Sequence, residues 1–118
     1  MKVVIPVDEN KDTVCVAFGR APYFMVCDTG NDSVEYKNNP AASAHGGAGI
    51  KAAQFIVDLA ADALITVRLG ENSAEVLKAT GMKIYKSTAV GTKANMEALK
   101  KGELSELTQF HTGFHGRV

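Results

Sequence analysis

The sequence predicts an α/β domain of three layers, built around a mixed five-stranded sheet. Short β-prone runs come first along the chain, and helical periodicity then alternates with further apolar runs. One of these runs, residues 63–67, is uninterrupted, which is typical of a parallel strand covered on both faces. A chain of 118 residues with 46% hydrophobic residues is of the size expected for one domain with one core.

The first part of the chain predicts a strand followed by a β-hairpin. Residues 2–7 form an apolar run that ends in a polar loop. Residues 23–29 are again apolar, and residues 34–37 follow after Thr29-Gly30-Asn31-Asp32. Because Gly and Asn tolerate positive φ, we expect a tight turn between these two strands.

The second part of the chain predicts three helices and two more strands. We expect helices over residues 50–61, 72–80 and 92–101, separated by strands over residues 63–67 and 82–85. The spacing of polar residues gives the first of these helices a narrow polar stripe and a wide buried face.

Capping residues indicate where the last two helices begin and end. We expect Asn72 or Ser73 to cap the second helix and Thr92 to cap the third. Gly81 and Gly102 supply the left-handed residues that end them. We take residues 1–104 as one domain and residues 105–118 as a polar C-terminal tail.

The order of elements, βββαβαβα, matches the ribonuclease H-like topology. In that topology the second strand runs against the other four, and the crossovers are right-handed. Four strands then end at one edge of the sheet, where four loops converge: residues 8–21, 38–49, 68–72 and 87–92. We expect the functional site at this edge, because ligands of open α/β sheets bind outside the carboxyl ends of the strands.

The most informative motif is His45-Gly46-Gly47-Ala48-Gly49, at the start of the first predicted helix. Glycines allow close approach of the backbone, and the free N–H groups and dipole of a helix start attract an anion. The imidazole of His45 can coordinate a metal or donate a hydrogen bond to a sulfide or an oxyanion. The alternative interpretation is a plain loop leading into a helix.

Three other segments of the same edge offer candidate binding groups. Phe18-Gly19-Arg20 would present a planar cation, although a surface Arg beside a tight turn is the favoured interpretation of this segment taken alone. Arg68, Gly70 and Asn72 could extend an anion site, or could belong to a helix cap. Gly91-Thr92 has the same two interpretations.

Four segments together resemble the dinitrogenase iron-molybdenum cofactor biosynthesis family, which includes nitrogenase cofactor carriers and the molybdenum-copper orange protein. They are Ile5-Pro6-Val7-Asp8, Phe18-Gly19-Arg20-Ala21-Pro22-Tyr23-Phe24, Asn39-Pro40 and His45-Gly46-Gly47-Ala48-Gly49. The likeness runs from Lys2 to about Leu104. It implies a ribonuclease H-like fold that carries or protects an anionic metal-sulfur cluster, containing molybdenum with iron or copper, and it implies cofactor-assembly proteins as partners.

One position departs from the family pattern. Members commonly have a histidine immediately before Phe-Gly, and the resemblance implies that it ligates the cluster. This chain has Ala17 there. We therefore expect a cluster held by charge and hydrogen bonds, with His45 as the candidate protein ligand.

The two cysteines, Cys15 and Cys27, lie in apolar surroundings and do not form the framework of a secreted disulfide protein. We interpret them as packing residues and keep Cys15 as a secondary candidate for a metal ligand. Two further soft ligands, His111 and His115, lie in the predicted tail, where we expect solvated side chains. Unpaired cysteines suit the reducing cytoplasm, which is the location that we expect.

Composition excludes some functions and disfavours others. The 13 basic and 13 acidic residues balance, so the chain lacks the positive charge of a nucleic-acid binder, and we expect no nucleic acid, no membrane and a monomer. A nuclease of the ribonuclease H type needs clustered carboxylates, whereas the fourth strand ends at Arg68. We expect a protein without enzyme activity. The alternative function is a regulatory or scaffold module that binds a partner protein and no cofactor.

Overall fold

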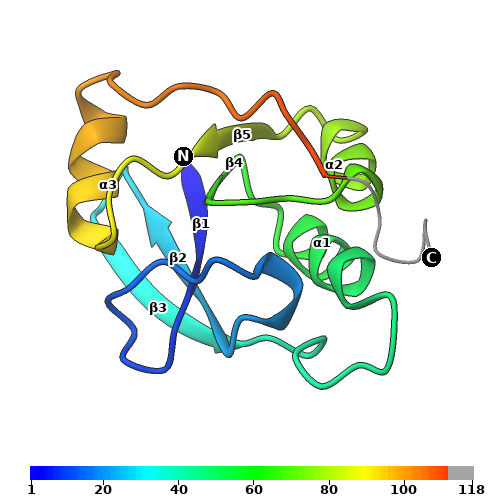
Figure 1. Ribbon diagram of the computed structural model, residues 1–118. Coiled ribbons are helices and arrows are strands. Elements are labelled where there is room, and N and C mark those ends of the chain that lie inside the picture. The colour runs from blue at the N-terminus through cyan, green and yellow to red at the C-terminus, as the bar shows by residue number, and fades with distance from the viewer. Residues whose placement is uncertain (112–118) are drawn as a thin grey trace.

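A computed structural model describes residues 1–111 and shows three layers (Figure 1): α1 and α2 cover one face of a central sheet and α3 covers the other. The elements in chain order are β1 (Lys2–Val7), the 3₁₀ turn η1 (Phe18–Arg20), β2 (Tyr23–Asp28), β3 (Ser33–Asn38), α1 (Ala48–Asp58), β4 (Ala63–Thr66), α2 (Glu71–Lys78), β5 (Lys83–Lys86) and α3 (Thr92–Lys100). Apart from η1, this is the predicted order.

The sheet has the predicted strand directions. Its order is β3-β2-β1-β4-β5, in which β2 pairs antiparallel with both β1 and β3, while β4 pairs parallel with both β1 and β5. Strands β1, β3, β4 and β5 therefore run together and β2 runs against them, as in the ribonuclease H-like topology.

Alternating side chains of the central strands form two cores, one on each face. Val4 of β1 and Leu64 of β4 pack against α1 and α2, and both are fully buried. Their neighbours Val3 and Ile65 pack with Met96 of α3. This alternation is why residues 3–7 of β1 and 63–65 of β4 are all apolar.

Two predicted helix caps are wrong. Helix α2 has Gly70 at the N-cap, so Asn72 lies inside the helix, as does Ser73, which is buried. Helix α3 has Gly91 at the N-cap, and Thr92 is its first residue. At α3, a backbone carbonyl pairs with the helix start in place of a side-chain cap: the Thr92 N–H donates to the Asp12 carbonyl over 2.8 Å.

Some turn residues also differ from prediction. In the hairpin, the left-handed residue is Asp32, with φ of 56°, and the Gly30 N–H donates to the Asp28 carboxylate instead. Helix α1 ends at Asp58, earlier than predicted, and the chain turns at Ala60 with φ of 60°. Gly81 has positive φ after α2, as predicted, and so does Gly102 after α3.

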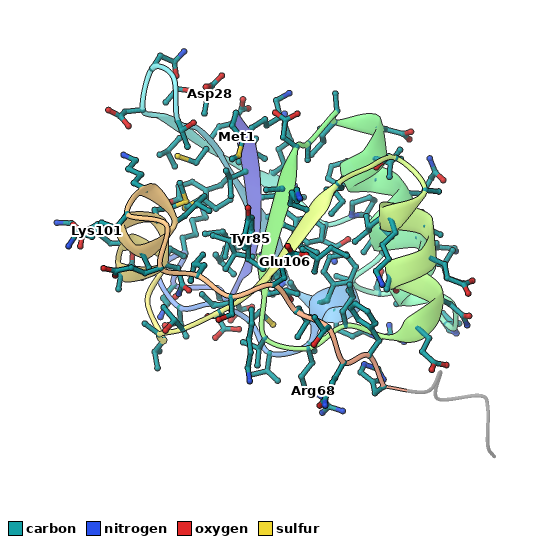
Figure 2. All side chains as sticks on the ribbon, turned by 90° about the horizontal axis from the view of Figure 1, so that it is seen from above. Met1, Asp28, Arg68, Tyr85, Lys101 and Glu106 are labelled. Carbon is teal, nitrogen blue, oxygen red and sulfur yellow. The ribbon has the colours of Figure 1, made fainter. Side chains whose placement is uncertain are left out.

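The segment after α3 forms a strap, residues 103–111, that runs along the edge strand β5. Figure 1 shows it crossing from α3 toward the start of α2. Glu106 forms an antiparallel bridge with Tyr85, and the two lie beside each other in Figure 2. His111 is exposed as expected, but its backbone is paired with the chain between β4 and α2. His115 lies outside the described residues.

Candidate functional site

A cleft of about 610 Å³ opens at the carboxyl edge of the sheet. Figure 2 shows Arg68 at this edge, at the opposite end of the molecule from Met1 and Asp28. The cleft is lined by η1 with the two residues before it, by the first turn of α1 with the loop before it, and by the start of α2. Its lining residues are Val16, Ala17, Phe18, Gly19, Arg20, His45, Gly46, Gly47, Ala48, Gly49, Ile50, Arg68, Leu69, Gly70, Asn72, Ser73 and His111.

Most residues that the sequence singled out meet in this cleft. Arg20, His45 and Arg68 come from three separate loops and line it together. Gly91 and Thr92 were also singled out, but they do not line it. The loop before α3 pairs with the first loop instead, through a bridge between Gly91 and Thr13, because α3 crosses to the opposite face of the sheet.

Close packing of backbones forms one wall of the cleft. A Cβ atom on Gly19 would lie 2.7 Å from the Gly49 nitrogen and 2.9 Å from the Ala48 carbonyl carbon, so η1 touches the first turn of α1 directly. The preceding Phe18 is buried, with its ring centroid 5.8 Å from that of Phe24. Phe18 thus anchors this wall in the core, and the absence of a side chain on Gly19 allows α1 to pack directly against it.

Arg20 has a structural contact as well as an exposed position in the cleft. Its Nη1 donates to the carbonyl oxygens of Ala42 and Ala44, immediately before His45. The guanidinium carries further N–H groups in a planar fork, which remain suited to an anion. Arg20 therefore ties the loop that carries His45 to η1 and places a positive charge beside it.

The buried side chain of Asn39 also links η1 to the loop that carries His45, from behind the cleft lining. Its Nδ2 donates to the carbonyl oxygens of Gly19 and Ala21 over 3.1 and 2.9 Å. Its Oδ1 accepts from the Ala41 N–H over 2.9 Å. Asn39 is only 6% exposed, so these bonds are shielded from water. The Asn-Pro pair of the sequence motif supports the cleft and does not line it.

The start of α1 presents backbone donors to the cleft. Gly47 is the N-cap with φ of 66°, in the left-handed region that favours glycine. Within residues 1–111, no side chain caps this helix start. The first N–H groups of a helix have no partner inside the helix and carry its positive dipole, so this end suits an anionic ligand. Gly49 also lets α2 approach, because a Cβ there would lie 2.6 Å from the Ser73 hydroxyl.

The charges at the cleft have one sign. Arg20 and Arg68 both line it, and none of its lining residues in the described chain is Asp or Glu. His45 is exposed there and adds a donor or a metal ligand. This donor set fits a small anion or an anionic metal cluster.

Six of the described lining residues were not predicted as binding residues: Val16, Ala17, Ile50, Leu69, Ser73 and His111. Val16 and Ile50 are 54% and 45% exposed and give the cleft an apolar border. Their exposure depends on tertiary packing, which residue type does not reveal. His111 was noticed as a histidine but expected in a solvated tail, because no local signal shows that the strap returns to the cleft.

Neither cysteine is among the described residues that line the cleft. Cys15 is buried and donates to the Ala17 carbonyl over 3.6 Å, and Cys27 is buried in β2. Burial raises the pKa of both thiols and so favours the uncharged form, which is a poor metal ligand. In the described residues, no three His, Cys, Asp or Glu side chains gather to hold a metal ion.

Comparison with known families identifies the chain. The family of the dinitrogenase iron-molybdenum cofactor matches residues 1–102. The chain belongs to this family. The sequence resemblance is confirmed, and the cleft is formed almost entirely by residues inside the matched segment. Curated proteins show no significant sequence match to the chain.

Several solved structures share the fold. The apo form of the orange protein from Desulfovibrio gigas is 25% identical, with a TM-score of 0.83 over 91% of this chain and 92% of that chain. A Thermotoga protein described as a NifB protein of the DUF35 family is 36% identical, with a TM-score of 0.76 over 92% and 95% of the two chains. A dinitrogenase-named protein from Methanocaldococcus jannaschii, 21% identical over 92% and 96%, shares the fold with a TM-score of 0.69.

Proposed function

We propose that this protein binds an anionic metal-sulfur cluster, containing molybdenum with iron or copper, and carries or protects it during cofactor assembly. The observation that carries the proposal is the cleft itself. In a member of the iron-molybdenum cofactor family, two arginines, a histidine and an uncapped helix start line one cleft without a carboxylate among its described lining residues. Cofactor-assembly proteins are the proposed partners, and a monomer is the proposed form.

The strength of such a site is adequate for a carrier. Hydrogen bonds to charged groups contribute about 1.5 to 3 kcal/mol each, so three or four could give micromolar or tighter binding of a multiply charged cluster. Arg20 and Arg68 supply charge, and the first turn of α1 supplies directed N–H donors. A carrier must also release its cargo, which suits charge and hydrogen bonds better than several metal-thiolate bonds.

The residues just before η1 indicate how the cluster would be bound. Ala17 lines the cleft at the position where the family pattern implies a histidine ligand, and its side chain has no donor atom. Cys15, two residues earlier, is buried with its thiol directed to the Ala17 carbonyl. We therefore propose that His45 is the principal candidate for a direct bond to a metal and that the remaining contacts are electrostatic.

We further propose that the protein is a carrier and not an enzyme, acting in the cytoplasm. A nuclease of the ribonuclease H type would need carboxylates around its divalent metals. The lining of this cleft is basic, which would repel such metals. Buried, unpaired cysteines are compatible with a reducing compartment. In the described chain, no helix is long and apolar enough to span a bilayer.

The test is a titration of the purified protein with tetrathiomolybdate, with and without copper(I), followed by visible absorption. A saturable change at one equivalent, retained after gel filtration and weakened by added salt, supports the proposal. Metal analysis after anaerobic purification should then find molybdenum with iron or copper, together with sulfide. If neither experiment finds a bound cluster, the scaffold alternative replaces the carrier function.

A further inference from the structure

Backbone hydrogen bonds fix the strap of residues 103–111 to the domain along its length, beginning with the Glu103 N–H, which donates to the Ala98 carbonyl over 2.8 Å. The Lys86 N–H donates to the Ser105 carbonyl over 2.8 Å, and the Leu107 N–H donates to the Ile84 carbonyl over 2.9 Å. At its end, His111 both donates to the Leu69 carbonyl, over 3.2 Å, and accepts from the Glu71 N–H, over 2.9 Å. The strap thus continues the sheet beside β5 and ends at the start of α2.

Side chains hold the strap on both faces of the sheet. Leu104 packs against the core under α3, and Leu107 and Phe110 pack against the core under α1 and α2. The ammonium of Lys78 lies 4.3 Å from the centre of the Phe110 ring, a cation-π contact from α2 itself. The residue just before His111 is therefore held in place by packing and by charge.

This anchoring places the His111 ring in the cleft lining, over the N-cap of α2. A Cβ atom on Gly70 would lie 3.3 Å from the ring's Cε1, which is tight, so glycine leaves the space that the imidazole uses. The His111 side chain is nonetheless exposed. An imidazole at a helix start can donate a hydrogen bond to a sulfide or oxyanion, or bind a borderline metal.

His111 also lies beyond the segment that the family match describes, since that match ends at residue 102. Family membership therefore assigns it no role. The contacts that bring it to the cleft belong to this chain's own strap.

We infer that the strap supplies His111 as a second histidine of the binding site, whose imidazole contacts the anionic metal-sulfur cargo at the start of α2. The inference rests on the proposed function and deepens it. The cargo then touches three walls: η1 with Arg20, the α1 start with His45, and the strap with His111.

The test compares two single substitutions in the full chain, each titrated with tetrathiomolybdate. His111→Ala removes the imidazole, whereas Gln109→Ala, a matched control, removes an exposed side chain of the same strap that is not part of the cleft lining. We expect His111→Ala to bind about tenfold more weakly, as for loss of one hydrogen bond to a charged group, and Gln109→Ala to bind like the wild type. Thermal unfolding should show both variants folded.

A second readout observes the ring directly. In a long-range ¹H–¹⁵N spectrum of the three histidines, the signals that His111→Ala removes belong to His111. Tetrathiomolybdate should shift or broaden them in the wild type. If the wild type binds the probe while His111→Ala binds equally and the His111 signals stay unchanged, this inference is overturned and the proposed function stands. If the wild type does not bind the probe, the proposed function fails and this inference fails with it.

Discussion

The cleft and the rim before α3, residues 87–92, are built from the same local pattern but differ in what they leave open. Each helix at this edge begins after a glycine: Gly47 before α1, Gly70 before α2 and Gly91 before α3. At the α3 rim, the Asn95 side chain accepts from the Thr88 N–H and donates to two carbonyls of the same loop. The first N–H of α3, that of Thr92, donates to the Asp12 carbonyl, so the rim is paired by backbone groups although no side chain in the described chain caps α3.

The cleft differs from this rim in how its loops pair. Its buried amide, Asn39, bonds to the loops behind the lining, and Arg20 ties those loops together. As at α3, no side chain in residues 1–111 caps the first turn of α1, but here no other loop pairs with the N-cap residue as the first loop pairs with Gly91. A glycine before a helix is therefore not enough for the anion site that we propose. The neighbouring loop must also leave the helix donors unpaired.

Among the substitutions that test this comparison, Gly19→Ala should have the largest effect. The new Cβ would meet backbone atoms of α1 at 2.7 Å, and backbone cannot move aside as a side chain can. We expect a loss of about 3 kcal/mol in unfolding free energy, at the upper end for overpacking, together with loss of tetrathiomolybdate binding. Urea denaturation measures the first and titration the second.

Gly91→Ala is the matched control on the α3 rim. Its φ of −90° suits any residue, and the nearest atom to the new Cβ, the Asp12 carbonyl oxygen, lies 3.9 Å away. The unfolding free energy should change by less than about 0.5 kcal/mol. Equal losses in the two alanine variants would refute the steric account of Gly19.

The second prediction distinguishes the roles of the buried amide side chains of Asn39 and Asn95. Asn39→Ala and Asn95→Ala each leave buried backbone groups unpaired and should each lower the unfolding free energy by about 2 kcal/mol. Only Asn39→Ala should also weaken tetrathiomolybdate binding, because only Asn39 supports the loops of the cleft. Measuring stability and affinity on the same samples tests this. Weaker binding by Asn95→Ala at a temperature where it is fully folded would contradict the separation.

The third effect concerns charge. Arg20→Ala should weaken tetrathiomolybdate binding about tenfold or more, because it removes a charged donor and frees the loop before His45. The effect should exceed that of His45→Gln, which keeps a donor. Lys93→Ala, an exposed cation in the first turn of α3, should leave the affinity unchanged. Abolition of binding by His45→Gln, with little effect of Arg20→Ala or of salt, would instead identify a coordination site.

The smallest effect should come from the cysteines. Cys15→Ser and Cys27→Ser should each retain tetrathiomolybdate affinity within about twofold, since both thiols are buried and burial raises their pKa. Loss of the visible absorption in either folded variant would show that a thiolate binds the cluster.

The raised pKa also has a consequence for stability. The folded protein holds the Cys15 proton more tightly than the unfolded chain does. The contribution of this thiol to the unfolding free energy is therefore complete below the ordinary thiol pKa and is lost as the pH rises through the higher pKa of the folded state. The alkaline fall in stability should be less steep in Cys15→Ser than in the wild type, as measured by urea denaturation across that pH range.

The sequence by itself determined the elements, the strand directions and the edge that carries the cleft. These follow from local information: the apolar run at β4, the periodicity of α1 and the glycines that end α2 and α3. The motif residues Arg20 and His45 were assigned to one edge because both follow strands of the same direction, and both line the cleft.

The tertiary structure alone decided which helix starts remain open and which side chains join them. Gly91 and Gly47 look alike in sequence, but α3 crosses to the other face, where the first loop pairs with Gly91. The contact of Gly19 with Gly49 and the return of His111 to Gly70 join residues that lie far apart in the sequence. Local propensity carries no record of such contacts, because they arise only when separate elements pack on one sheet.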